Sequence, residues 1–219
     1  IHMDVLGILD LDRNEISVDA VLYDSRLAIF PITGGMALRI KWGAEPVFLL
    51  AVGGFNPRFT PPPDFPALDR VGIQLTYNKD GVRAGLCLTS YMAITASTAQ
   101  FGARIDAYAE TSLAKIAGYL GFDALIEMAP FHVIVDLYGG VTVHAFGLGF
   151  SCDILLTLAA FDPVTGNGHV TIDFFGKHEV PIHFEIGEAK PLPALPVVDP
   201  MDELVAALSD LRNWSAALP

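Results

Sequence analysis

Hydrophobic and polar residues alternate along most of the chain before residue 190. The alternation is clearest in five stretches, at residues 16–22, 38–42, 73–77, 101–107 and 182–186. Because successive side chains of a β-strand point to opposite faces, this period of two predicts strands with one buried face and one mixed face. The whole pattern predicts roughly eleven to thirteen strands.

Turn-forming residues separate these stretches. Gly, Asn and Asp gather at residues 12–15, 33–35, 78–81, 139–140 and 165–168. Gly and Asn tolerate the positive φ of tight turns, and a short turn can join only antiparallel neighbours. We therefore expect an all-β fold, a long up-and-down antiparallel meander that forms a strongly curved sheet, a sandwich or a barrel, with one short C-terminal helix.

Two predicted strands are apolar on both faces. Residues 47–52 have no polar position, and residues 153–158 have almost none. A strand of this kind is covered on both sides in a folded protein. The sheet is therefore expected to curl over itself, or to be covered by a second sheet, a helix, a partner or a ligand.

Composition divides the chain into a long β domain and a C-terminal extension. Ile1-His2-Met3 is typical of residues left by cloning, so residues 1–3 are set aside and the native N-terminus is expected to be missing. The antiparallel β domain is expected over residues 4–190, interrupted by a proline-rich excursion at 56–69 that cannot pair as a strand. Residues 191–200 are expected to form a proline-rich, extended arm.

A docking helix is predicted over residues 201–217. Asp199 is a suitable N-cap and Pro200 suits the first turn. The apolar residues of the helix recur at intervals of three and four, which gives it one face that must dock on another surface; these residues are Leu204, Ala207, Leu208 and Leu211. A weaker helical pattern covers Thr111–Tyr119.

The charge balance limits the partners. The chain has 25 acidic and 13 basic residues, a net charge of -12, so it repels phosphate backbones and no nucleic-acid partner is predicted. No apolar run of about 18 residues is present, so no transmembrane helix is predicted.

Cys87 and Cys152 are far apart in the sequence. We favour two separate core thiols, and a single disulfide between them remains the alternative. The compartment is left open, with the cytoplasm favoured.

Catalytic and metal-binding motifs are absent from the sequence. There is no Gly-x-Ser-x-Gly elbow and no phosphate-binding glycine loop before a helix. We predict no catalytic residue, no metal site and no cofactor.

The histidines were considered separately as ligands or catalytic groups. His178 and His183 are five residues apart, which places them on opposite faces of a strand. His132 and His144 could face each other across a hairpin centred near 139–140, and with Asp136 they form the alternative hypothesis of an enzyme site.

Glycines and aromatic residues are mixed along residues 84–150. One interpretation, which we favour, is sheet curvature in which aromatic rings cover the glycines. The other is a concave apolar surface for a hydrophobic ligand or a partner segment. The candidate ligand-binding residues for that surface are Tyr91, Phe101, Tyr108, Phe122, Phe131 and Phe150.

Four segments carry a resemblance to a known family. They are FLLAVGGFNPRFTPP at 48–62, STAQFGAR at 97–104, GYLGFDAL at 118–125 and RNWSA at 212–216. With these segments the chain resembles the DUF6603 family, large and mostly bacterial proteins of uncharacterised function. The resemblance brings no assigned catalytic residues, and it implies that the chain is a piece of a longer protein.

These observations lead to one main hypothesis and two alternatives. The main hypothesis is a non-catalytic β scaffold or binding module. Its partner would be an apolar small molecule or lipid, or other segments of the parent polypeptide. The first alternative is an enzyme whose site is built from strand polar residues near His132, Asp136 and His144. The second is a purely structural module of its own polypeptide.

Overall fold

The computed structural model describes residues 1–160 and 163–187, together with Ser209. The chain divides into two units, residues 1–188 and 189–219. The described part of the first unit consists of strands, turns and irregular segments, without a helix. Its strands are β1 (His2–Asp10), β2 (Glu15–Tyr23), β3 (Ser25–Leu27), β4 (Phe30–Thr33), β5 (Gly35–Lys41), β6 (Val47–Val52), β7 (Val71–Lys79), β8 (Val82–Thr95), β9 (Thr98–Glu110), β10 (Ala114–Met128), β11 (Phe131–Ala145), β12 (Leu148–Ala160), β13 (Val164–Asp173) and β14 (Lys177–Ile186).

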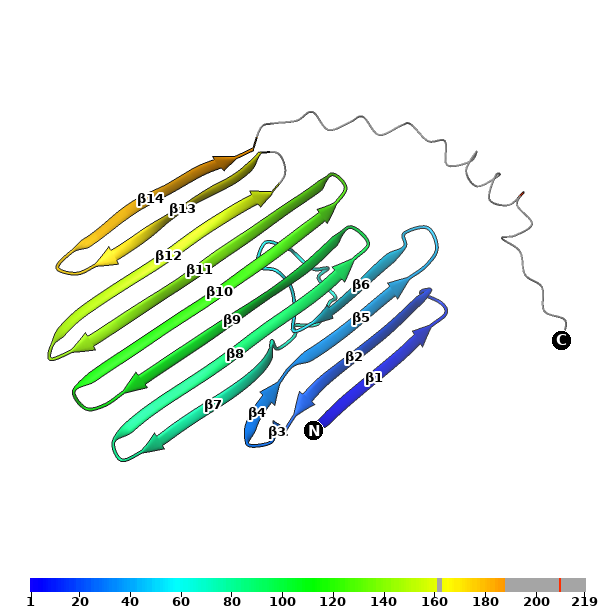
Figure 1. Ribbon diagram of the computed structural model, residues 1–219. Helices are drawn as coiled ribbons and strands as arrows, with labels where there is room; N and C mark the ends of the chain where they lie inside the picture. Colours follow the sequence, from blue (N-terminus) through cyan, green and yellow to red (C-terminus); the bar gives the residue numbers. More distant parts are fainter. Residues whose placement is uncertain (161–162, 188–208, 210–219) are drawn as a thin grey trace. The chain divides into compact units, whose positions relative to one another are not determined.

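All the described strands belong to one antiparallel sheet. Short turns place β7 to β14 side by side in chain order, and β1, β2, β5 and β6 continue the sheet beyond β8 (Figure 1). The short strands β3 and β4 leave this path, and β4 pairs with β7. The sheet does not close, because β1 and β14 stand at its two ends. The all-β class and the predicted antiparallel meander are confirmed, and the sheet is open.

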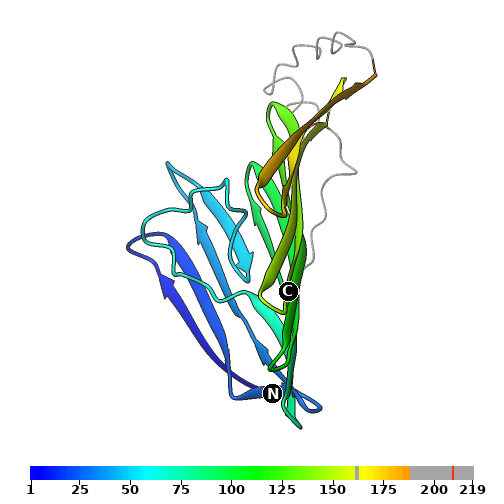
Figure 2. The same ribbon diagram turned by 90° about the vertical axis from the view of Figure 1, so that its left-hand side faces the viewer.

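Strand β8 joins the two parts of the sheet. One edge of β8 pairs with β7 over Val82–Ser90 and with β6 over Met92–Thr95. The chain between β6 and β7, residues 53–70, crosses one face of the sheet and is called the crossing segment below. Figure 2 shows it in the angle between strands β1–β6 and strands β8–β14, so the sheet bends toward the face that carries this segment. The predicted proline-rich excursion at 56–69 lies within it and is confirmed as a non-strand segment.

The best-buried apolar cluster lies beneath the crossing segment. Leu49, Ala51 and Ala93 point from β6 and β8 toward the segment, and its residues Phe55, Phe65 and Leu68 pack against them. The two alanines are fully buried, because their small side chains let the segment approach the strands closely. Burial of this apolar surface holds the segment on the sheet.

One glycine makes the crossing sterically possible. Gly53 follows β6 with a φ of 73°, a conformation that residues with a Cβ adopt only under strain. A Cβ at this position would lie 2.5 Å from the carbonyl oxygen of Ser90 and 2.9 Å from the amide nitrogen of Val71. The chain can therefore leave β6 beside β8 only because position 53 has no side chain.

The buried side chain of Gln100 adds a directional contact between the crossing segment and the sheet. The backbone N–H of Asn56 donates to Oε1 of Gln100 at 3.0 Å. Gln100 in turn donates from Nε2 to Oγ1 of Thr98 at 2.9 Å. Asn56 and Gln100 are almost completely buried, so each of these hydrogen bonds replaces contacts with water that burial removes.

The turn predictions were partly correct. Asp80 and Gly81 form a two-residue hairpin turn, with φ values of 53° and 75°, as residues 78–81 predicted. Residues 139–140 do not form a turn, because they lie inside β11, and residues 165–168 lie inside β13. The helical pattern at Thr111–Tyr119 was also wrong: these residues include the β9–β10 turn and the start of β10.

The expected cover of the apolar strands is found on one side of β6. Leu49 and Ala51 are buried under the crossing segment, whereas Phe48 on the opposite face is 40% exposed in the described unit. Residues 2–3, which were set aside as a cloning remnant, take part in β1. The predicted arm at 191–200 and, apart from Ser209, the predicted helix at 201–217 lie outside the described residues.

Candidate functional site

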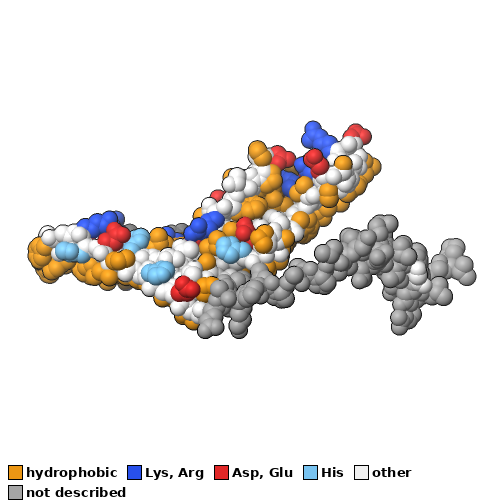
Figure 3. Space-filling view, turned by 90° about the horizontal axis from the view of Figure 1, so that it is seen from above, with side chains coloured by type: hydrophobic (Ala, Val, Ile, Leu, Met, Phe, Trp, Pro, Cys, Tyr) orange, Lys and Arg blue, Asp and Glu red, His pale blue; other side chains and the backbone are white. Residues whose placement is uncertain are grey.

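The two faces of the sheet differ sharply in chemistry. In β8–β13 the strand pairing places every Asp, Glu, Lys and Arg on the face that carries the crossing segment. We call this the polar face. The opposite face, the apolar face, continues from β1 to β14, and Figure 3 shows hydrophobic side chains along it with charged groups on the other side. Such a sheet is amphipathic as a whole.

The apolar face is largely open to solvent in the described unit. Its members alternate along each strand with residues of the polar face, and many large side chains are more than one third exposed. These exposed residues include Met3, Val5, Leu9, Phe48, Leu75, Leu86, Leu88, Met92, Ile94, Phe101, Ile105, Leu120, Leu137, Val141, Phe150, Ile154, Ile172, Val180 and Ile186.

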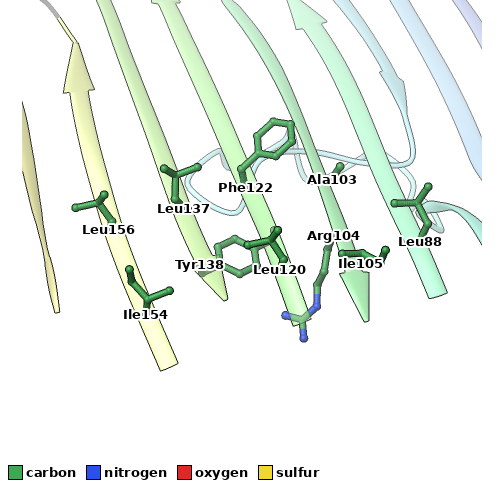
Figure 4. A pocket seen from close by; sticks show the side chains of 11 residues that line it. Leu88, Ala103, Arg104, Ile105, Leu120, Phe122, Leu137, Tyr138, Ile154 and Leu156 are labelled. Carbon is green, nitrogen blue, oxygen red and sulfur yellow. The ribbon is translucent and has the colours of Figure 1, made fainter. Parts of the chain in front are cut away.

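A shallow hollow of about 490 Å³ lies on the apolar face across β8–β12. Figure 4 shows the aliphatic and aromatic side chains that surround it on five adjacent strands. Ala103 leaves space because of its small side chain, and the backbone at Gly121 also lines the hollow. The apolar side chains around the hollow are Leu88, Ile105, Leu120, Phe122, Leu137, Ile154 and Leu156.

The six predicted ligand-binding aromatics are divided between the two faces. The strand pairing places Phe101, Phe122, Phe131 and Phe150 on the apolar face and Tyr91 and Tyr108 on the polar face. Phe122 lines the apolar hollow, and its ring meets Phe101 edge-on at 6.1 Å. The structure therefore brings two of the six together near the hollow and places the others elsewhere.

Sequence reasoning missed the aliphatic residues of the hollow. Leu120, Leu137 and Ile154 lie on three adjacent strands, and each belongs to the apolar half of an alternating stretch. The alternation marks them as members of one face. The cross-strand register, which the sequence pattern does not show, decides that they become neighbours.

The tyrosines of the polar face lean over glycines on neighbouring strands. Tyr138 pairs with Gly121, and a Cβ at Gly121 would lie 2.5 Å from its ring. Tyr119 pairs with Gly140 in the same way across β10 and β11, and Tyr91 and Tyr108 pair with the glycines of β9 and β8. This arrangement supports the interpretation in which aromatic rings cover the glycines within the sheet.

Two tyrosines share one buried carboxylate. The hydroxyl of Tyr91 donates to Oδ1 of Asp123 at 2.8 Å, and the Arg70 guanidinium lies 3.9 Å from the centre of the Tyr91 ring. Burial and the bond to Asp123 raise the pKa of Tyr91 far above its ordinary value of 10. Burial and the same carboxylate raise the pKa of Tyr138 to about 12. Both phenols therefore stay protonated at neutral pH and act as hydrogen-bond donors.

Arg58 ties the crossing segment to β11. Its Nε and Nη2 donate to the two carboxylate oxygens of Asp136 at 2.6 and 2.8 Å, and Thr157 donates to the same carboxylate at 2.6 Å. The Arg58 hydrogen bond lowers the pKa of Asp136 against the opposing effect of burial, and the Thr157 bond lowers it further. A bidentate guanidinium–carboxylate pair fixes orientation as well as distance.

The residues of the enzyme hypothesis are not brought together. His132, Asp136 and His144 share the polar face of β11, which runs straight through 139–140, so the predicted hairpin between the histidines is wrong. At about 3.3 Å per residue, Asp136 lies about 13 Å from His132 and about 26 Å from His144 along the strand. His132 instead approaches Glu127 at 3.6 Å, while Asp136 is bound by Arg58.

The described residues contain no group of three or more His, Cys, Asp and Glu side chains that could hold a metal ion. His178 and His183 lie on opposite faces of β14, as their spacing predicted. Cys87 and Cys152 are both free. They also lie on opposite faces, Cys87 on the polar face and Cys152 on the apolar face, so they cannot form a disulfide with each other.

The described residues define a β protein whose single antiparallel sheet has one polar and one apolar face. Residues 1–217 match DUF6603, a family of unknown function, so the chain belongs to that family and the resemblance of the four sequence segments is confirmed. No curated protein matches the chain, and no solved structure matches it. Among the described residues there is no helix with the length and apolarity needed to span a membrane.

Proposed function

We propose that the chain is a non-catalytic interaction module whose apolar face docks on another apolar segment of its parent polypeptide. The observation that supports this is the continuous apolar face, which extends from β1 to β14 opposite a polar face. A second layer on this face would turn the open sheet into a sandwich. The function is then to hold two parts of a longer protein together.

The extent of the apolar face favours a polypeptide over a small ligand. An exposed apolar patch larger than a few hundred Å² marks an interaction surface in a soluble protein. The apolar hollow spans β8–β12, whereas exposed apolar side chains such as Val5 and Val180 lie near the two ends of the sheet. A single ligand in the hollow leaves those ends uncovered, and a polypeptide layer covers them.

The chemistry of the apolar hollow agrees with a side chain as its occupant. Small-ligand sites combine apolar walls with a few polar groups that orient the ligand. Arg104 and Tyr138 contribute to the boundary of the hollow, but their polar ends belong to the polar face, where Arg104 bonds Asp106 at 2.7 Å. A bulky apolar side chain from the docked layer needs no orienting polar group.

The two native cysteines give an internal test. Cys152 lies on the apolar face and Cys87 on the polar face, and both are half-buried in the chain. We expect maleimide to label Cys152 much more slowly in the longer parent polypeptide than in the isolated chain, with the rate at Cys87 unchanged. Peptide mass spectrometry separates the two sites.

Two outcomes would overturn the proposal. If Cys152 is labelled at the same rate in both proteins, no segment of the parent covers the apolar face. If Cys152 is protected only after phosphatidylcholine vesicles are added, the face binds lipid instead of polypeptide. In both outcomes Cys87 remains the reference for the reactivity of an uncovered thiol.

A further inference from the structure

Two hairpin turns of the sheet contain a phenylalanine at a backbone position that favours glycine, asparagine or aspartate. Phe146 has a φ of 53° in the β11–β12 turn, and Phe175 has a φ of 57° in the β13–β14 turn. The β7–β8 turn has Asp80 at a φ of 53°, an ordinary choice for this conformation. A bulky side chain at positive φ strains the backbone, and such strain is concentrated at functional positions. The two phenylalanines therefore need an explanation other than the formation of the turns.

Packing within the described unit does not account for these phenylalanines. Phe146 is 82% exposed, and Phe175 is 84% exposed although its ring lies 4.3 Å from that of Phe174. Leu113, in the neighbouring β9–β10 turn, is 67% exposed, and its carbonyl accepts a hydrogen bond from the N–H of Phe146 at 3.4 Å. Leu113 and Phe146 thus protrude from turns that contact each other, which makes them part of one patch instead of scattered surface residues.

The four turns that join β7 to β8, β9 to β10, β11 to β12 and β13 to β14 lie along one edge of the sheet, at the lower left of Figure 1. This turn edge comprises residues 79–83, 110–115, 144–149 and 173–178. Glu110 lies opposite both Arg83 and Lys115, and Lys115 lies opposite His144, so the first three turns end level. At about 4.8 Å between strands, the eight strands make a row about 34 Å long. A straight row of protruding tips matches a flat surface.

The turn edge differs in charge from the rest of the chain. It carries three acidic and four basic residues, whereas the whole chain has a net charge of -12. These residues are Asp80, Glu110, Asp173, Lys79, Arg83, Lys115 and Lys177. Glu110 is paired with Arg83 at 3.1 Å, and in the part of the chain that the structure describes Lys115 and Lys177 have no carboxylate partner. Each of these two lysines lies two residues from an apolar tip, Leu113 or Phe175.

We propose that the turn edge binds the surface of a phospholipid bilayer. Leu113, Phe146 and Phe175 insert among the headgroups, and Lys115 and Lys177 meet the lipid phosphates. Apolar side chains with lysines directly behind them are the arrangement by which proteins anchor at a membrane interface. The net negative charge of the chain opposes this approach, but salt at physiological concentration screens charges more than about 8 Å away.

A lipid surface fits the turn edge better than a further polypeptide strand does. The N–H and C=O groups of a β-ladder point sideways to the neighbouring strands, so a row of turns offers no strand edge to pair with. The apolar tips also belong to separate hairpins in one line, and a bilayer accepts such tips without a matching pocket for each.

The proposed membrane contact is independent of the docking proposed for the apolar face. Cys152 is five residues beyond Gly147, which places it about 17 Å from the tip of its hairpin along β12. Interfacial side chains enter a bilayer by about 5–10 Å. Contact through the turn edge therefore leaves Cys152 accessible to maleimide, whereas lipid on the apolar face protects it.

Vesicle sedimentation of the full chain tests the proposal. The native chain should sediment with vesicles of phosphatidylcholine that contain phosphatidylserine. The double variant Phe146→Asn, Phe175→Asn should bind about tenfold more weakly or less, because two apolar side chains no longer leave water. Its urea midpoint should be unchanged or higher, because asparagine tolerates positive φ better than phenylalanine does. A merely structural role of the phenylalanines predicts a lower midpoint.

Two matched variants locate the contact and its charge. Leu120→Asn changes an exposed residue of the apolar face and should leave vesicle binding unchanged. Lys115→Gln with Lys177→Gln should weaken binding about tenfold on vesicles with phosphatidylserine and much less on phosphatidylcholine alone. The proposal is overturned if the native chain does not sediment with vesicles, or if the asparagine pair binds as the native chain does. An equal loss with Leu120→Asn would assign lipid binding to the apolar face instead.

Discussion

Tyr138 and Gly121 show how one residue pair shapes the polar face. The tyrosine ring occupies the space where a Cβ of Gly121 would be, 2.5 Å from the nearest ring atom. Burial and the hydrogen bond to Asp123 raise the pKa of this phenol to about 12, because they favour its protonated form, which can donate to that carboxylate. The glycine is therefore required by the neighbouring ring, not by an unusual backbone conformation.

A matched pair of substitutions measures this steric requirement. Gly121→Ala should lower the free energy of unfolding by about 1–3 kcal/mol, because the added methyl group displaces the Tyr138 ring. Gly7→Ala is the control, since a Cβ at Gly7 would meet only Val18, at 4.0 Å. Urea unfolding should show little change for the control. Equal effects at the two positions would contradict the account of the tyrosine–glycine pairs.

At the scale of elements, the crossing segment joins strands that are distant in the sequence. Its residues contact Gln100 in β9 and Asp136 in β11, and Arg39 in β5 lies 5.4 Å from the centre of the Phe65 ring. These contacts hold the bend of the sheet on the polar face. They also place a polar clamp, Arg58–Asp136, on the face of the sheet opposite the apolar hollow.

The clamp predicts a pH dependence. Because the pKa of Asp136 is lowered in the folded protein, its contribution to stability is present above its ordinary value of 3.8 and is lost as the pH falls through the lower folded value. Arg58→Met should cost about 1 kcal/mol at pH 7, since the guanidinium is partly exposed. This difference should shrink toward zero as Asp136 is protonated below pH 3.8. Urea titrations of both proteins across this range check it, and a pH-independent difference would contradict it.

The sequence pattern was sufficient for the all-β class, for the antiparallel meander and for the non-strand character of residues 56–69, but it predicted eleven to thirteen strands where the described residues form fourteen. Local alternation predicts a strand because it depends only on neighbours, and the proline run at 61–63 excludes ladder hydrogen bonds. Gly139-Gly140 was predicted to form a turn. Glycine occurs both in turns and in strands beneath the aromatic ring of a neighbouring strand, and the local sequence does not separate these two cases. Only the cross-strand partner, Tyr119 over Gly140, distinguishes the two cases.

The candidate site was harder to predict for the same reason. The alternation along a strand shows that Phe122 and Asp123 lie on opposite faces. Which residues of five adjacent strands share a face, however, depends on the register of every hairpin. The six aromatics were grouped by residue type, so Tyr91 and Tyr108 were grouped with phenylalanines of the opposite face. The hollow is formed mainly by leucine and isoleucine, which no local motif distinguishes from other strand residues.

For the whole molecule, the central feature is an amphipathic sheet with an exposed apolar face. Its charged residues are confined to the polar face across β8–β13, which keeps the apolar face free of the groups that oppose burial. In the proposed function, covering this apolar face holds two parts of a longer protein together.

The most direct measurement introduces one carboxylate on each face by substitution. It compares the resulting change in the free energy of unfolding in the isolated chain and in the longer parent polypeptide. Leu120 is 64% exposed on the apolar face of the chain, and Thr142 lies on the polar face. In the isolated chain, Leu120→Asp and Thr142→Asp should each change the free energy of unfolding by less than about 0.5 kcal/mol. In the parent, Leu120→Asp should cost about 3 kcal/mol or more, because docking buries an unpaired charge, while Thr142→Asp stays small. Equal, small effects of both substitutions in the parent would contradict a covered apolar face.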